Sequence, residues 1–159
     1  MKYVSENRLS DFEFHDSVFM LDKWEKIANA DWLTLKVKHL NVHKNAMPNN
    51  SGTDMEIEYA NITFGDFKIL EFEPSRNWKK DEKGKLYTDD PIVIFKGEEA
   101  RKMLENELRN AVTVMGIAAD GEGYELGAIG IDPYFSARFT FSSVKIEWND
   151  YVGQAWYIR

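Results

Sequence analysis

The chain has 159 residues, of which 43% are hydrophobic and 14% aromatic, enough apolar material for one globular domain spanning residues 1–159. It contains no cysteine, which excludes disulfides, thiolate metal sites and cysteine nucleophiles. The formal net charge of -7 at pH 7 argues against a nucleic-acid binder and fits a basic partner, although the same charge also keeps a protein soluble.

The N-terminal segment, residues 1–14, carries mixed charge and lacks the apolar core of a signal peptide. The sequence also lacks any run of about 18 uncharged apolar residues, the length expected of a membrane-spanning helix. We therefore predict a cytoplasmic protein that does not contact a membrane.

The first clear element is a half-buried strand at residues 32–43, where apolar and polar side chains alternate. Leu35 and Val37 share one face, but after Lys38 the apolar positions move to Leu40 and Val42. A period of two absorbs such a shift only through a bulge or a bend, so we predict one after Lys38.

Alternation resumes at residues 55–59 and continues on both sides of residues 64–67, where the sequence Phe-Gly-Asp-Phe predicts a hairpin with a type II′ turn. Residues 75–90 are polar and charged, which predicts a long loop or hairpin tip. The apolar run at residues 92–95 predicts a short buried strand.

One amphipathic helix is predicted at residues 97–111, with Glu98 and Glu99 in its first turn and Arg109 in its last, where they complement the helix dipole. Residues 112–117 either extend this helix or begin a strand. Four further strands are predicted at residues 124–131, 134–141, 144–148 and 154–158. The sum is an α+β fold, mainly antiparallel, in which about eight strands form a curled sheet, barrel or sandwich covered by one helix.

Two groups of residues have the types needed for metal or nucleophilic chemistry, but in the wrong pattern. His39 and His43 are four residues apart, yet no third ligand is identifiable and the metalloprotease motif is not met. His15, Asp16 and Ser17 are the residue types of a hydrolase triad, but neighbours on an extended chain point to opposite sides. We therefore predict no metal and no cofactor.

The carboxylate pairs Glu71/Glu73 and Glu56/Glu58 have a spacing compatible with glycoside hydrolysis, but solvated strands produce the same spacing routinely. The glycine-rich residues 120–130 miss the dinucleotide-binding pattern and carry two glutamates. The basic run at residues 76–85 is interleaved with acidic residues, which favours a solvated loop over nucleic-acid binding. These patterns predict no catalytic residue, and our working hypothesis is that the protein is not an enzyme.

The C-terminal region concentrates aromatic and acidic residues, the composition that protein interfaces use for anchors and charge complementarity. Trp148 and Trp156 fit the core of a terminal hairpin at least as well as an interface. With the acidic flank near the N-terminus, the predicted partner-binding residues are Asp16, Glu147, Trp148, Asp150 and Tyr151.

Three short motifs carry a resemblance: residues 14–17 (Phe-His-Asp-Ser), the Phe-x-x-x-x-Ile-x-Trp pattern at residues 141–148, and residues 155–157 (Ala-Trp-Tyr). With these motifs the chain resembles small bacterial proteins, some of which are immunity proteins of polymorphic toxin systems. The resemblance implies a non-enzymatic protein that binds a toxin domain and blocks its active site.

Three functions therefore stand after the sequence is read, of which the last, a structural subunit of a larger assembly, predicts a large apolar surface patch and stable oligomers. The first is a protein-binding module with an acidic and aromatic contact surface, which matches the net charge and the missing catalytic set. The alternative is a small-molecule-binding or hydrolytic barrel or sandwich. It requires that at least two members of one set converge on a cavity: His15, His39, His43, Glu71 and Glu73. The partner and the oligomeric state are left open.

Overall fold

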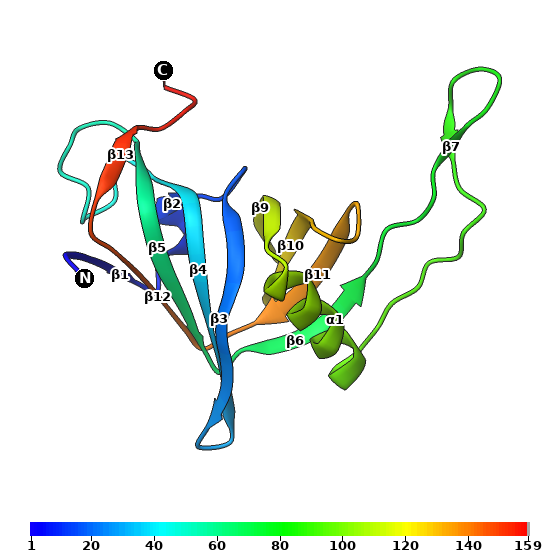
Figure 1. Ribbon diagram of the computed structural model, residues 1–159, viewed down its shortest axis with the longest axis horizontal. Coiled ribbons are helices and arrows are strands. Elements are labelled where there is room, and N and C mark those ends of the chain that lie inside the picture. The colour runs from blue at the N-terminus through cyan, green and yellow to red at the C-terminus, as the bar shows by residue number, and fades with distance from the viewer. Residues whose placement is uncertain (159) are drawn as a thin grey trace.

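A computed structural model describes residues 1–158, so Arg159, the last residue of the predicted domain, lies outside the description. The fold is mainly antiparallel β-sheet with one α-helix, as predicted, and its large sheet is curled but not closed into a barrel (Figure 1). The elements are β1 (Tyr3–Glu6), β2 (Phe12–Glu13), β3 (Val18–Ile27), β4 (Ala30–Val42), β5 (Met55–Gly65), β6 (Lys68–Glu73), β7 (Lys79–Lys80), β8 (Leu86–Tyr87), α1 (Gly97–Arg109), β9 (Val112–Asp120), β10 (Gly123–Ile129), β11 (Phe135–Thr140), β12 (Ser143–Trp148) and β13 (Tyr151–Gln154), with a short 3₁₀ turn at Leu9–Asp11.

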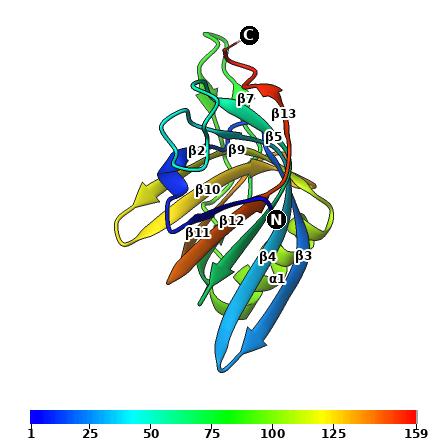
Figure 2. The same ribbon diagram turned by 90° about the vertical axis from the view of Figure 1, so that its left-hand side faces the viewer.

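The large sheet has two halves that meet at a narrow junction between β3 and β9. The first half contains β1, β12, β5, β4 and β3, and the second half contains β9, β10, β11 and β6. Its strand order is β1-β12-β5-β4-β3-β9-β10-β11-β6, and all its pairings are antiparallel. β3 and β9 share only two residue pairs, Val18 with Thr113 and Phe19 with Val112. Figure 2 shows the strands of the two halves running at a marked angle to one another.

The predicted bend in the strand at residues 32–43 is confirmed. Val37 and Leu40 are both fully buried although they are three residues apart, an odd separation for a regular strand. Between them His39 takes a left-handed conformation, with φ of 58°, which turns the following residues over to keep the apolar side chains inside.

The predicted hairpin at residues 64–67 is wrong, because β5 and β6 do not pair with each other. β5 pairs with β4, β12 and β13, whereas β6 pairs with β11 in the other half. Phe64 and Phe67 are both buried, with ring centroids 5.7 Å apart, so this turn carries the chain around the core from one half to the other. Gly65 is required there because Ser143 and Trp32 occupy the space of a side chain.

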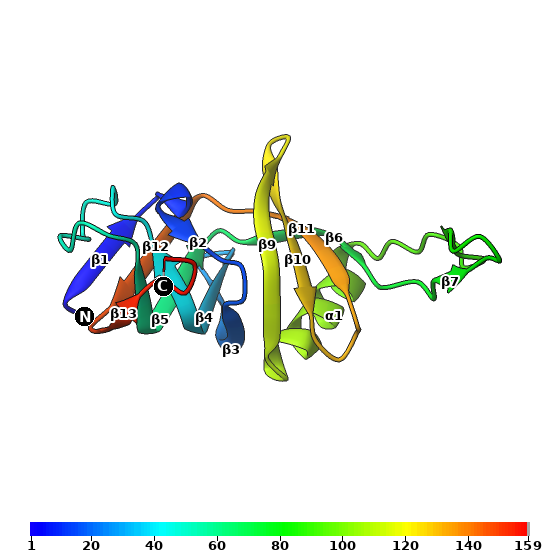
Figure 3. The ribbon, with the colours of Figure 1, turned by 90° about the horizontal axis from the view of Figure 1, so that it is seen from above.

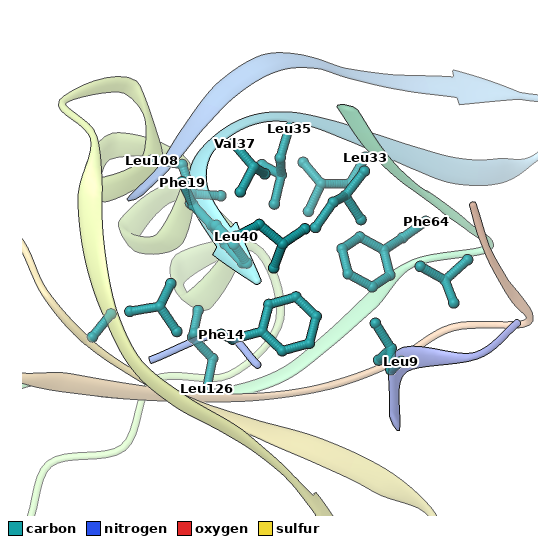
Figure 4. Packing of buried hydrophobic residues seen from close by; sticks show 14 of the residues in the cluster. Leu9, Phe14, Phe19, Leu33, Leu35, Val37, Leu40, Phe64, Leu108 and Leu126 are labelled. Carbon is teal, nitrogen blue, oxygen red and sulfur yellow. The ribbon is translucent and has the colours of Figure 1, made fainter. Parts of the chain in front are cut away.

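The predicted helix is present but ends at Arg109, two residues earlier than expected. Ala111 adopts a φ of 62°, which stops the helix, and Val112 begins β9, so the strand alternative for residues 112–117 is confirmed. The helix buries Ala100, Leu104 and Leu108 on its inner face. Leu104 and Leu108 line the core together with Phe19 of β3, and Figure 4 shows Leu108 next to Phe19.

Residues 74–94 form an arm that extends away from the body and carries the short β7–β8 ladder (Figure 3). The predicted buried strand at residues 92–95 is wrong, because only Phe95 pairs with the sheet, by a bridge to Phe72. Ile92, Val93 and Ile94 are exposed, with Ile92 63% exposed. None of the three belongs to the hydrophobic core formed by residues 1–158.

The C-terminal strands at residues 124–131, 134–141 and 144–148 are confirmed within one or two residues, as β10, β11 and β12. The last predicted strand, at residues 154–158, is wrong: β13 lies at Tyr151–Gln154 and pairs with β5. Sequence patterns also missed β1, β2 and β3. With these strands and the short β7 and β8 of the predicted loop, residues 1–158 contain thirteen strands where about eight were predicted. No helix within residues 1–158 is long and apolar enough to cross a membrane.

Candidate protein-binding surface

Trp148, one of the five predicted contact residues, is a core residue, so its predicted place at the contact surface is wrong. Its side chain has no exposed surface. The indole stacks on Tyr3, with ring centroids 5.5 Å apart, and meets the edge of Phe12 at 5.8 Å. Trp148 faces inward because it alternates with Glu147 on β12, so it cannot touch a partner in this structure.

The other four predicted residues do not form one patch. Tyr151 is half-buried against Tyr3, and burial raises the pKa of its phenol. Glu147 makes an ion pair with Lys145 at 3.5 Å, and Asp150 is exposed in the turn before β13. Asp16 lies in the turn before β3, where its backbone amide donates to the Val114 carbonyl, and makes no contact with the other four among the described residues.

Each of the three histidines lies beside a carboxylate rather than in a cavity. His39 Nδ1 is 2.9 Å from Glu56 Oε1, and His43 Nδ1 is 3.1 Å from Asp54 Oδ2. None of the five cavities characterised in residues 1–158 is lined by a histidine. Within the same residues no three His, Cys, Asp or Glu side chains are arranged to hold a metal ion.

His15 fastens the turn before β3 to β9. Its Nδ1 lies 2.9 Å from the Met115 carbonyl, a contact that raises the pKa of the imidazole because the protonated ring donates to that oxygen. Burial opposes this effect, whereas Asp16 and Glu13 add to it. The Ser17 hydroxyl is buried and donates to the Phe14 carbonyl at 2.6 Å, so residues 15–17 serve packing and turn formation, not a triad.

Asp54 holds the C-terminal segment to the body. Although burial opposes its ionisation, the Tyr157 hydroxyl, the Lys44 amide and His43 donate to it and keep the pKa of the carboxyl below its usual range. The Tyr157 contact is 2.7 Å long, and burial together with the Asp54 charge raises the pKa of that phenol.

Because the pKa of Asp54 is lower in the folded protein, its ionisation contributes stability above the unfolded value of 3.8, and this contribution is lost as pH falls through the folded pKa. We expect Asp54→Asn to lower stability at pH 7 by about 1–2 kcal/mol and to lose less stability than the wild type between pH 5 and 2. Urea unfolding across this pH range measures both effects. Parallel stability curves for the two proteins would contradict the assignment.

The aromatic interior has little free space. The cavity among Phe19, Leu104 and Leu126 measures about 20 Å³, the size needed for one water molecule. A larger apolar groove of about 490 Å³ lies on the outer face of the first half and is lined by Met20, Tyr59 and the stems of lysines, with Lys38 over the Tyr59 ring.

The acidic groove lies on the second half of the sheet. We give this name to the depression of about 560 Å³ lined by residues 115–120, Glu125, Gly127 and Tyr134. The depression forms because Gly116 and Gly127 are cross-strand partners without side chains, and Ser136, the partner of Gly127 on β11, has only a small one. Gly127 has no side chain, which leaves space for the Tyr134 hydroxyl directly above it.

The charge around the acidic groove is mostly negative. Asp120 is paired with Arg138 at 2.9 Å, and Arg138 also approaches Glu71 at 3.8 Å. Glu125 is exposed, and neither it nor the neighbouring Glu73 has an ion pair or side-chain hydrogen bond within residues 1–158. The surface therefore offers uncompensated carboxylates beside an exposed tyrosine.

The base of the arm continues this surface. Tyr134 also lines a cavity of about 180 Å³ formed with Glu73, Trp78 and their neighbours. Trp78 is exposed, with the Arg76 guanidinium 5.0 Å from its ring centroid, and Asp132 accepts the backbone N–H of Ser75. The acidic groove thus leads onto an aromatic edge, which sequence reasoning missed because its parts lie far apart along the chain.

Comparison of the chain with protein-family models, with curated proteins and with solved structures finds no match.

Proposed function

We propose that this protein is a non-enzymatic binding module that recognises a basic protein through the acidic groove. The observation that carries the proposal is the combination of a shaped depression, the uncompensated carboxylates Glu73 and Glu125, and exposed aromatic rings at its border. A partner with Lys or Arg side chains would satisfy those carboxylates and be steered by the net charge of -7.

Within this proposal the partner is a toxin domain neutralised in the bacterial cytoplasm, as the resemblance of the short motifs suggests. Those motifs support the proposal by similarity alone, since Phe14 and Trp148 pack in the core. The alternative, a small molecule held in the interior, has less support because the core cavity measures about 20 Å³.

A comparison of two charge-reversal variants tests the contact surface. Glu73→Lys/Glu125→Lys alters the acidic groove, and Glu147→Lys/Asp150→Lys makes the same charge change at the C-terminal region predicted from sequence. We expect purified wild type to capture a stoichiometric basic protein from lysate of its own cells, or from products of neighbouring reading frames, with capture weakened at moderate salt.

The groove variant should weaken the affinity for that protein by at least about tenfold, because two attractive charges become repulsive, while the C-terminal variant should bind like wild type. Isothermal titration of the identified partner against all three proteins gives the affinities. The proposal is overturned if no stoichiometric partner appears at either salt concentration, or if only the C-terminal variant loses binding.

A further inference from the structure

One side of β9 is an open sheet edge. β10 pairs with β9 from Thr113 to Asp120 on one side, whereas β3 pairs on the other side only with Val112 and Thr113. Val114 then exchanges hydrogen bonds with the turn before β3, and His15 contacts the Met115 carbonyl. Beyond Met115 no strand or turn pairs with this side of β9 within residues 1–158.

The alternation of an antiparallel ladder identifies the free backbone groups. Asp120 and Gly123 face each other across the two-residue turn at 121–122, so they form the hydrogen-bonded pair that closes the hairpin. Two residues earlier, Ala118 again points its backbone groups at β10. Ile117 and Ala119 consequently point their N–H and C=O groups to the open side, the same side as the Met115 carbonyl.

This edge lacks the features that usually prevent strand addition. Exposed edges are commonly protected by lysine, proline or a covering segment, yet residues 116–120 read Gly-Ile-Ala-Ala-Asp. Gly116, Ala118 and Ala119 are small, and both alanines are exposed, so a second backbone has room to approach. The register of β9 and β10 shifts at Gly127/Ala128, outside the open stretch of β9. The five residue pairs that include residues 116–120 are regular.

The open edge also borders the acidic groove, since residues 115–120 line it. Side chains of an added strand would alternate between the core side of the sheet, near Ile117, and the groove side. A cationic side chain on the groove side would lie near Asp120 and Glu125, with Tyr134 available for cation–π contact.

We propose that the open edge of β9 accepts an extended basic segment of the partner protein by β-strand addition. The segment pairs with the backbone of Ile117 and Ala119 and places a Lys or Arg side chain in the acidic groove. This inference rests on the proposed function and specifies its mode of recognition: main-chain hydrogen bonds supply affinity, and the carboxylates select a basic sequence.

The first test uses synthetic eight-residue peptides with blocked ends. An alternating Val-Lys peptide should bind the wild type and slow the amide exchange of Ile117 and Ala119, as measured by NMR. A Val-Glu peptide should not bind. The Val-Lys peptide N-methylated at every residue has the same charge but cannot donate a main-chain hydrogen bond from either edge, and should bind at least about tenfold more weakly.

The second test changes the edge itself. Ala119→Pro removes an N–H that points away from β10, so the hairpin should persist, while peptide affinity should fall by at least about tenfold. Unchanged exchange protection in the rest of β9 and β10 would verify that the variant folds. The N-methylated peptide tests the complementary hydrogen bonds, from peptide N–H groups to the carbonyls of β9, without any protein variant.

The outcomes separate the inference from the proposed function. If Glu125→Lys weakens binding of the Val-Lys peptide but N-methylation and Ala119→Pro do not, the groove binds basic groups and strand addition is wrong. If the peptide does not bind while the basic partner is still captured through the groove, strand addition is again wrong. If sedimentation instead shows a dimer that Ala119→Pro abolishes, the edge pairs with a second copy and the inference is overturned.

Discussion

Trp148→Ala is expected to lower the free energy of unfolding by about 3–5 kcal/mol, the range measured for large aromatic side chains removed from packed cores. Trp148 is 0% exposed and contacts Tyr3, Phe12 and Tyr151 through its ring. The deleted side chain would leave a cavity that these neighbours fill only in part. Urea unfolding followed by far-ultraviolet circular dichroism measures the change without depending on tryptophan fluorescence.

The matched control is Trp156→Ala, which removes the same side chain from a position that is 46% exposed. Within residues 1–158 its ring contacts His15 and Tyr157 but no other aromatic ring, so we expect a loss of about 1 kcal/mol or less. If Trp148→Ala does not fold, Trp148→Phe should still show an intermediate loss. Equal unfolding midpoints for Trp148→Ala, Trp156→Ala and wild type would contradict the assignment of Trp148 to the core.

Glu107→Ala is expected to destabilise the fold by about 3 kcal/mol, because it removes a buried charged acceptor from two backbone donors. Glu107 is only 6% exposed although it lies on α1. Its carboxylate accepts the N–H groups of Ile131 and Asp132 at 2.9 and 3.0 Å, which ties the helix to the turn between β10 and β11. Gly130 precedes this turn and lacks the side chain that would collide with the carboxylate.

The same turn leads directly to Tyr134, so the loss should extend to the acidic groove. Amide exchange at Ile131 and Asp132 should accelerate in Glu107→Ala, and affinity for a groove-binding partner should fall with it. Glu105→Ala is the control, since Glu105 pairs with Arg109 at 2.9 Å along the same helix, and the loss of this i,i+4 pair should cost about 0.5 kcal/mol. Similar losses for the two variants would refute the role given to Glu107.

The proposed site shows the limit of composition as a guide. Carboxylates and aromatic rings were the residue types expected at a contact surface, and both occur at the acidic groove. The predicted members at residues 147–151 were nevertheless divided between core and surface by the alternation of β12, which buries Trp148 and leaves Glu147 outside. The alternation tells which residues share a face of the strand. Sequence alone does not tell which face is buried, because that depends on which face of the sheet meets the rest of the chain.

Sequence by itself determined what depends on near neighbours along the chain: the mainly antiparallel class, the helix at Gly97–Arg109 and the bend at His39. Periods of two and 3.6 residues and a break in such a period are local signals. Tertiary structure alone decided the course of the chain at Phe64–Phe67, the exposure of Ile92, and the groove formed where Gly116, Gly127 and Tyr134 meet. These features arise from strand pairings between distant segments, whose choice depends on how all apolar faces are buried together rather than on any one of them.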